Sequence, residues 1–385
     1  MPLLRPLLAS LAFVSLGLPD GLLGVAWPSI RGSFGLELDA VGALLVATTL
    51  GYVSSSFSSG RISGILTVGT LVGASCALTG LALLGYATVT SWPVLVGLGV
   101  CLGLGAGAVD AVLNTYAATR NGHGMLNWLH ACYGIGAAAG PLLMTAILAR
   151  SLPWQRGYLL VAAGQLVLAI AFIGTAGSWT SSHSSAEPRA AVPIASTLRV
   201  RSAQLGILVF LFYAGVEASV GLWTYTLLVE GRGFTAAAAA LIVSLFWGGL
   251  TCGRLLAAAV AGRLPAGRLL PLCLALVLTG TLLLLAGGST LLCAAGVALA
   301  GTACGPIFPT LIATTPARVG SAHAGNAVGF QVAAAAAGMA FLPAVVGALA
   351  AATSVALIAA TFVIFAVALS AAYAGLQSAR SAEPA

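Results

Sequence analysis

Long apolar stretches separated by short polar ones repeat along nearly the whole chain. Each stretch is close to the roughly 20 residues that a helix needs to cross the hydrocarbon core of a bilayer. The pattern therefore predicts twelve membrane-spanning helices, near residues 7–27, 39–59, 64–87, 93–118, 125–149, 157–177, 204–229, 235–258, 267–287, 289–315, 323–350 and 352–376. The first stretch follows Arg5 as a signal peptide would, but it is too long and ends at Trp27 and Pro28 without a small-residue cleavage site.

One polar stretch, 178–203, is far longer than the other loops and is rich in serine, proline and alanine. It divides the predicted helices into two sets of six. We therefore expect an N-terminal bundle over 1–177, a cytoplasmic linker over 178–203 and a C-terminal bundle over 204–385. The predicted fold class is an all-α membrane protein with twelve transmembrane helices in two pseudo-symmetric six-helix bundles.

Matching residues in the two halves support this symmetry. Asp20 and Glu217 are separated by the same sequence offset as Gly24 and Gly221. Many other glycines lie four residues apart, a spacing that lets helices approach closely in lipid. Repeated halves of this kind are known from membrane proteins that carry solutes across the bilayer.

Composition excludes a water-soluble fold. Of the 385 residues, 60% are apolar and only 6% are charged, whereas soluble domains carry about 25% charged residues. All the basic residues are arginines, and they lie singly or in pairs at the ends of apolar stretches. Because binding of nucleic acid requires a basic face or stripe, we expect no nucleic-acid partner.

The arginines also orient the chain. With the N-terminus inside, most arginines fall in cytoplasmic segments, and only Arg31, Arg150, Arg156 and Arg232 fall in outer loops. This positive-inside bias predicts a multi-pass protein of the cell inner membrane with both termini in the cytoplasm.

No motif indicates an enzyme, a metal site or a cofactor. The seven cysteines lie at irregular spacing inside apolar stretches and form no CxxC pair, so we interpret them as packing residues. The sequence holds no phosphate-binding loop for ATP-driven pumping. A sensor would need a signalling domain, which the linker and the short ends do not supply. We expect no catalytic residues, no metal and no cofactor.

Three acidic residues, Asp20, Asp110 and Glu217, lie well inside apolar stretches. A charged side chain at mid-membrane costs roughly 2.5–3.5 kcal/mol on insertion scales and usually marks an ion or solute pathway. No arginine is expected at the same depth in any helix. The carboxylates could therefore face a wet cavity, bind and release protons there, or await a cationic solute. The alternative is a structural hydrogen bond to a neighbouring helix.

Other polar residues share helical faces with these acids. Asn114 lies one turn after Asp110, so that an amide beside a carboxylate offers hydrogen bonds to a polar solute. Asn127 and His130 share a face of the fifth stretch. His130 either titrates near neutrality or bonds to a backbone carbonyl.

Aromatic residues are further candidates. Trp27 and Trp223 either stack on a solute or belong to an interfacial aromatic belt. The eighth stretch carries a polar stripe at helical spacing, formed by Ser244, Trp247, Thr251 and Arg254. We interpret Arg254 as a structural latch or anchor at the cytoplasmic side, and we add Trp247 and Gln331 to the candidate solute contacts.

Three segments together resemble a known family. They are GAVDAVLNTYAATRNGHGMLNWLHACYGIGAAAGPLL (107–143), FYAGVEASVGLWTYTLL (212–228) and FWGGLTCGRLLA (246–257). The first resembles the fourth and fifth helices of the fucose/galactose/glucose–proton symporter branch of the major facilitator superfamily, and the others resemble its seventh and eighth helices.

The resemblance implies roles for individual residues. Asp20 would handle protons, and Asp110 would contact solute beside Asn114. The family commonly has a glutamate where Asp110 stands, and its charged loop signature after the second helix is reduced here to SSGRISG (58–64). We expect a cavity lined by helices one, four, seven and ten, and we expect the prolines of Gly305-Pro306-Ile307-Phe308-Pro309 to break the tenth helix.

These observations together predict a secondary active transporter that moves a small polar solute, by resemblance a sugar, with protons by alternating access. Its predicted proton-coupling residues are Asp20, Asp110 and Glu217. Its predicted substrate-binding residues are Asp110, Asn114, Trp27, Asn127, His130, Trp223, Trp247 and Gln331. The alternative is a proton-coupled efflux antiporter for cationic or amphipathic compounds. The expected partners are a small-molecule substrate, protons and the lipid bilayer, and we expect a monomer.

Overall fold

The structure, a computed structural model, describes residues 4–62, 65–120, 122–179, 192–260 and 264–382. Among the described residues, twelve helices are long and apolar enough to cross a membrane, as the apolar pattern predicts. The first six are α1 (Leu4–Phe34), α2 (Val41–Ile62), α3 (Val68–Thr88), α4 (Trp92–Arg120), α5 (Gly122–Leu148) and α6 (Gln155–Gly174). Two short 3-10 turns accompany them, η1 (Leu38–Ala40) and η2 (Ala176–Ser178).

The second half begins with the short α7 (Ile194–Leu198). The helices that follow are α8 (Arg201–Thr226), α9 (Ala236–Val260), α10 (Ala266–Ala286), α11 (Thr290–Cys304), α12 (Ile307–Thr314), α13 (Pro316–Val319), α14 (Ala324–Ala352) and α15 (Ile358–Ala382). A π-helical turn, η3 (Leu227–Gly231), extends α8, and a 3-10 turn, η4 (Val355–Leu357), precedes α15.

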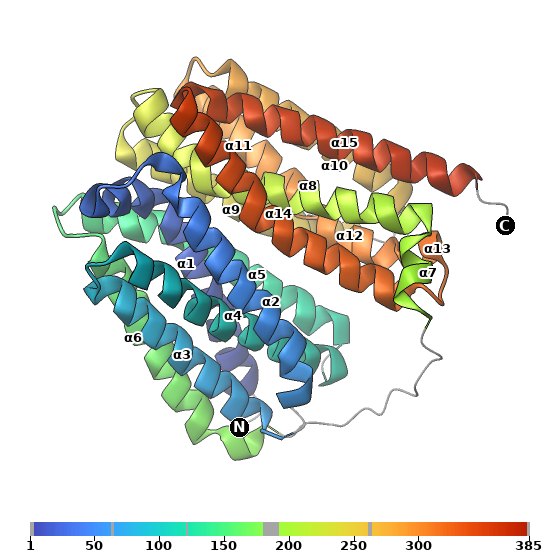
Figure 1. The fold of residues 1–385 in the computed structure, drawn as a ribbon, viewed down its shortest axis with the longest axis horizontal. Helices are drawn as coiled ribbons and strands as arrows, with labels where there is room; N and C mark the ends of the chain where they lie inside the picture. The colour runs from blue at the N-terminus through green and yellow to red at the C-terminus, as the bar shows by residue number, and fades with distance from the viewer. Residues whose placement is uncertain (1–3, 63–64, 121, 180–191, 261–263, 383–385) are drawn as a thin grey trace.

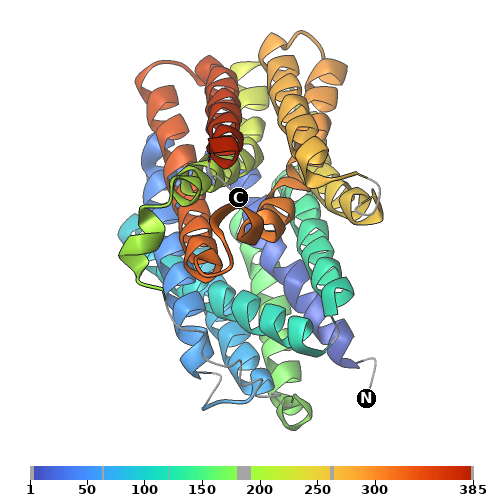
Figure 2. The same cartoon turned by 90° about the vertical axis from the view of Figure 1, so that its right-hand side faces the viewer.

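The helices form two groups that lean against each other. The α1–α6 group and the α8–α15 group lie close together at the left of Figure 1 and separate toward the lower right, with the N-terminus marked at the bottom and the C-terminus at the right. Figure 2 looks onto the diverging side, with the first group below and the second above. The groups meet where α5 packs on α9, α2 on α14 and α1 on α8. We call the left end of Figure 1 the closed end and the opposite end the diverging end.

The first span is longer than the sequence predicts, and the tenth span agrees with its prediction. α1 was expected to end at Trp27 and Pro28, but it continues through Pro28 to Phe34, because neighbouring helices can support the backbone around a proline within a membrane bundle. The tenth span is broken as predicted: α11 ends at Cys304, and α12 begins after Pro306.

Both described ends of the predicted linker 178–203 pack against the helices. Trp179 is buried and packs on Phe172 of α6 and Tyr116 of α4. Thr197 is buried and pairs with the His323 ring at 2.9 Å. Residues 180–191 lie outside the described residues, so the domain boundaries stay a prediction.

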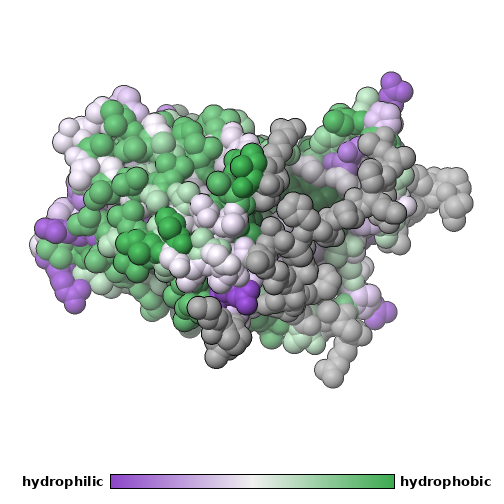
Figure 3. Space-filling view, turned by 90° about the horizontal axis from the view of Figure 1, so that it is seen from below, coloured by the Kyte–Doolittle hydropathy of each residue, from purple (hydrophilic) through white to green (hydrophobic). Residues whose placement is uncertain are grey.

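The surface agrees with a membrane environment. In Figure 3, hydrophobic residues cover much of the face in view, and the most hydrophilic residues gather at the left edge and beside the grey segments. Large apolar side chains in the middle of helices are exposed, among them Leu50 of α2 and Ile170 of α6. Apolar side chains that face outward at mid-helix are the surface expected of a helix in contact with lipid.

Candidate solute and proton site

All three acids predicted to lie deep in the bundle accept a hydrogen bond from a tyrosine. Tyr133 of α5 donates to Asp20 of α1 with Oη and Oδ2 2.6 Å apart. Tyr52 of α2 donates to Asp110 of α4 over 2.6 Å, and Tyr213 donates to Glu217 one turn later in α8. A hydroxyl donor holds a carboxylate in place without neutralising its charge.

Asp20 lies where α1 faces the second half. Its side chain is exposed although its neighbours Pro19 and Gly21 are buried. Its charge lies close enough to Glu217 of α8 to interact with it across the boundary between the halves. The exposed face therefore points toward the other half rather than toward lipid, as a residue lining a wet path would.

Asp110 and Asn114 form a small polar cluster on α4. The Asn114 amide donates from Nδ2 to Oδ1 of Asp110 over 3.0 Å, which fits the shared face expected from the sequence. The Asn114 carbonyl oxygen is buried and has no hydrogen-bond partner among the described residues. This oxygen is left free to accept a hydrogen bond from a solute hydroxyl or from water.

Arg254 corrects one expectation from the sequence. Its charge interacts with Tyr133 and His130 of α5 and with Tyr213 of α8. The acids therefore do have a base in their neighbourhood. The sequence did not reveal it because Arg254 stands far along α9, and only the packing of α9 against α5 brings it to the acids.

His130 lies between charges from both halves. It is half-buried, its ring packs edge-on against Phe13 of α1, and its charge interacts with both Asp110 and Arg254. No bond from its ring to a carbonyl occurs among the described residues, and the role of His130 in the site stays a prediction.

The prediction that Trp27 and Trp223 contact a solute is not supported by this conformation. Both rings are fully buried. The Trp27 Nε1 donates to the Leu38 carbonyl over 3.1 Å, and the Trp223 Nε1 donates to the Pro343 carbonyl over 2.8 Å. Each indole is satisfied by backbone and packs between helices, so neither forms an interfacial belt or an open binding surface.

The three remaining predicted solute contacts, Trp247, Gln331 and Asn127, have different outcomes in the structure. Trp247 is buried against Gly221 of α8, and its Nε1 has no partner in the described part of the chain. Gln331 lies away from the acids, where it is buried and accepts a hydrogen bond from Thr315 over 2.9 Å, so its assignment to the site is corrected. The side chain of Asn127 lies outside the described residues.

The sequence reasoning missed the three tyrosines. Tyr213 precedes Glu217 by one helical turn, and that spacing alone could have revealed the pair. Tyr52 and Tyr133 reach their acids from other helices. No spacing along the chain predicts these two contacts.

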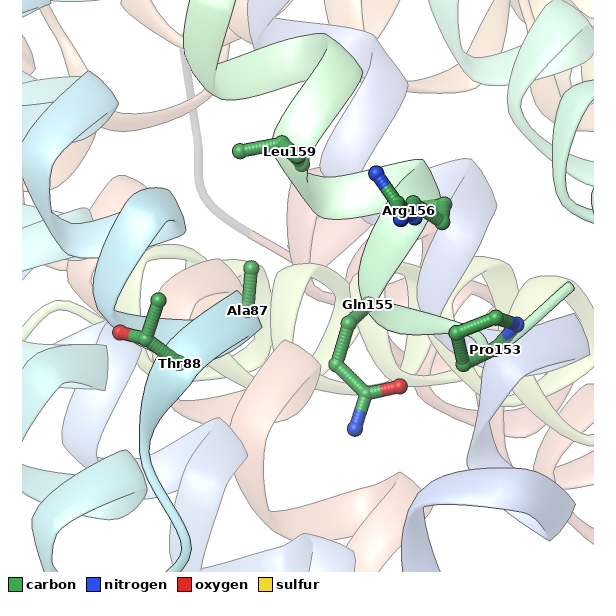
Figure 4. A pocket seen from close by; sticks show the side chains of 6 residues that line it. All are labelled: Ala87, Thr88, Pro153, Gln155, Arg156 and Leu159. Carbon is green, nitrogen blue, oxygen red and sulfur yellow. The ribbon is translucent and has the colours of Figure 1, made fainter.

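A separate shallow pocket lies near the closed end, between the end of α3 and the start of α6 (Figure 4). It is lined by Ala87, Thr88, Pro153, Gln155, Arg156 and Leu159. None of the predicted site residues belongs to it.

An ion pair joins the two halves at the closed end. Arg31, at the end of α1, lies 2.5 Å from Glu230 in the turn after α8. Further inward, Gly24 of α1 lies so close to the Leu222 carbonyl that an added Cβ would come within 2.7 Å of it. The two halves are therefore in direct contact at this end.

One curated protein, "Bypass of stop codon protein 6" of Saccharomyces cerevisiae, is similar in sequence. It is 26% identical over an alignment of 270 positions, which covers 63% of this chain and 54% of that protein. The chain thus spans about half the length of this curated relative.

Several solved structures share the fold. A mutant of the nucleoside transporter NupG superposes with a TM-score of 0.81 at 15% identity, covering 97% of this chain and 99% of that one. FucP in its outward conformation gives 0.66 at 16% identity, covering 97% and 98%. An inward-facing bacterial homologue of the lysosomal transporter Spinster gives 0.68 at 14% identity, covering 98% and 94%. At these identities the likeness concerns the fold.

A family model settles the relationship. The model of the Major Facilitator Superfamily matches residues 9–343, most of the chain. The match agrees with the twelve spans, with the two six-helix bundles and with the solved structures above. The chain belongs to the major facilitator superfamily, and it is a multi-pass membrane transporter rather than an enzyme.

Proposed function

We propose that the protein is a proton-coupled symporter of a small polar solute, by alternating access. One observation carries the proposal: the Asp20 carboxylate, in the middle of a spanning helix, is exposed toward the other half and held by the Tyr133 hydroxyl. An intramembrane acid that can reach water without a fixed cationic partner is suited to bind and release a proton.

Each half contributes one acid of a pair across the boundary. Asp20 belongs to α1 and Glu217 to α8, and their charges interact. Two like charges that interact across the boundary repel each other. When the halves separate, this repulsion falls. Protonation is therefore coupled to the relative position of the halves, as a proton-driven carrier requires.

Asp110 and Asn114 are the proposed solute contacts on the first half. The free Asn114 carbonyl oxygen and the Asp110 carboxylate offer acceptors for solute hydroxyls. A sugar or another polyhydroxylated solute matches this set of acceptors. FucP, which shares the fold, is named as a fucose:proton symporter, and fucose is a solute of this class.

The first test compares driven and undriven transport. We expect Asp110→Asn to abolish accumulation driven by an imposed pH gradient while some solute exchange persists, because the amide still bonds to solute but carries no exchangeable proton. Proteoliposomes measure both activities, with counterflow reporting the exchange. The matched control is Glu37→Gln, an exposed acid outside the bundle, which should transport as the wild type does. Unchanged accumulation in D110N would contradict the coupling role.

An efflux antiporter for cationic or amphipathic compounds is the second candidate. The exposed carboxylate of Asp20 favours it, since a cation can pair there as readily as a proton can bind. Vesicles with an imposed pH gradient separate the two functions. Uptake of labelled sugars supports symport, whereas export of fluorescent cations supports efflux.

For the orientation, we propose the cell inner membrane with both termini in the cytoplasm. The diverging end then faces the cytoplasm, and the end held by Arg31 and Glu230 faces outward. The bias of arginines toward the segments at the diverging end supports this orientation.

A further inference from the structure

Arg254 makes no direct ion pair with an acid in the described part of the chain, although Tyr213 and Cys304 interact electrostatically with both Arg254 and Glu217. It is half-buried in α9 and interacts electrostatically with groups of α5, α8 and α11, namely His130, Tyr133, Tyr213 and Cys304. Within the described part of the chain, no hydrogen bond or ion pair reaches its guanidinium, and the ion pair found there joins Arg31 to Glu230. Burying an arginine without a partner is costly, so such a residue usually has a ligand.

The symmetry of the two halves explains why Arg254 is unpaired. In the first half, Gly103 of α4 packs on the Thr48 carbonyl and the Tyr52 backbone nitrogen. In the second half, Gly305 packs in the same way on the Leu250 carbonyl and the Arg254 backbone nitrogen. Arg254 thus occupies in its half the place that Tyr52 occupies in the first.

In the second half, no acid stands at the position that corresponds to Asp110, which accepts the Tyr52 hydrogen bond. Asp110 lies two helical turns after Gly103 and accepts the Tyr52 hydrogen bond. The residue at the same distance after Gly305 is Ile312, which cannot pair with a guanidinium. The second half therefore keeps the cation and lacks its acid.

Two more donors on α9 are unpaired. Ser244 Oγ and Trp247 Nε1 are buried without a hydrogen-bond partner among the described residues. Ser244, Trp247 and Arg254 follow one another at helical spacing, so they share one face of α9. Unpaired buried donors on a shared face indicate that a solute or water accepts hydrogen bonds from them.

We propose that this face of α9 binds the carboxylate of the solute, so that the transported compound is a small hydroxylated carboxylate of the sugar-acid or hydroxy-acid class. Arg254 pairs with the carboxylate through its two-pronged guanidinium, a geometry that suits a planar anion. The hydroxyls of the solute bond to Asp20 and to the Asn114 carbonyl oxygen. A single arginine matches a monoanion better than the two charges of a phosphate monoester. The inference rests on the proposed function and names its class of solute.

The test compares solutes that differ only in charge. Purified protein is titrated with D-gluconate, D-glucuronate, D-glucose and D-glucose 6-phosphate, and thermal stabilisation reports binding. Pyranine-loaded proteoliposomes report proton movement with each solute. We expect the two acids to bind about tenfold or more tightly than glucose, the ratio given by one added ion pair.

Variants of Arg254 connect this preference to the residue. Arg254→Gln should lower the binding of the acids to the level of glucose in the same variant, and Arg254→Lys should keep part of the preference for the acids. The matched control is Arg268→Gln, an exposed arginine of α10, which should not change binding. If Arg254→Gln does not fold, the wild type and Arg254→Lys still decide the preference.

The outcomes separate this inference from the proposed function. Three results would overturn the inference. The first is an equal or absent response to the acids and glucose, and the second is a preference for glucose 6-phosphate. The third is an equal loss of all responses in R254Q. Proton movement with glucose alone would also overturn it and leave proton symport standing. Binding of the acids that depends on Arg254, without any proton movement, would support the inference and contradict proton symport.

Discussion

Each intramembrane carboxylate of this transporter is held by a tyrosine hydroxyl and not by a fixed cation. A buried salt bridge would keep an acid charged in every state of the transport cycle. A hydroxyl accommodates both forms, since it donates to the carboxylate and can accept from the protonated acid. Under the proposed proton coupling, Tyr133 on Asp20 and Tyr52 on Asp110 would allow the charge of each acid to change.

The pair of Tyr133 and Asp20 gives a prediction at the residue scale. Tyr133→Phe removes the donor to Asp20, and we expect proton-driven uptake to fall about tenfold, because a hydrogen bond to a charged group is worth roughly 1.5–3 kcal/mol. The pH at which uptake is half-maximal should move as well, which loss of packing alone would not cause. The control is Tyr158→Phe, whose buried hydroxyl has no partner in the described structure. Equal effects of the two variants would contradict a special role of Tyr133.

At the scale of elements, α5 packs against helices of both halves. On one side it packs against α1, where an added Cβ on Gly17 would lie 2.1 Å from the Tyr133 carbonyl oxygen. On the other side it packs against α9, where Gly134 touches Thr251. Because α5 carries both Tyr133 and His130, this close packing fixes the distances between the acids and Arg254.

Gly17 gives the prediction at this scale. Gly17→Ala should destabilise the protein by about 1–3 kcal/mol, since a methyl group has no room between α1 and α5. The melting temperature of the detergent-purified protein measures the change. Gly164→Ala on α6 is the matched control, because nothing lies within 4 Å of its added Cβ; it should be neutral or stabilising by up to about 1 kcal/mol. Equal stability of both variants would show that α1 and α5 can separate without cost.

At the scale of the whole molecule, the two bundles close over the site at one end and diverge at the other. The closed end combines tight contact of α1 with α8, the buried indole of Trp223 and the ion pair of Arg31 with Glu230. Alternating access requires these contacts to break when the other end closes. The ion pair is partly exposed, so it biases the equilibrium only modestly.

Charge reversal tests this bias. Arg31→Glu places a like charge beside Glu230 and should shift the population toward the form open at this end by about fivefold, the effect of roughly 1 kcal/mol. Spin labels on Gly32→Cys and Ala236→Cys, both exposed, measure the separation of the halves there. The exchange of both charges, Arg31→Glu with Glu230→Arg, should restore the original distances. Identical distances in all three proteins would mean that the ion pair does not hold this end.

The sequence by itself determined the fold class and the spans. Hydropathy decides whether a segment lies in lipid, and this property depends on composition over about 20 residues and not on distant contacts. For the same reason the depth of Asp20, Asp110 and Glu217 could be read from the chain. The pair of Asp110 and Asn114 was also predictable, since one helical turn fixes its geometry.

Only the tertiary structure decided which groups meet. The packing of α5 on both α1 and α9 joins Tyr133 to Asp20 and brings Arg254 near the acids. Packing against other helices buries Trp27 and Gln331, which the sequence had assigned to the site. The physical reason is that hydropathy sets depth in the membrane but not rotation about the helix axis, which depends on how side chains fit against neighbouring helices.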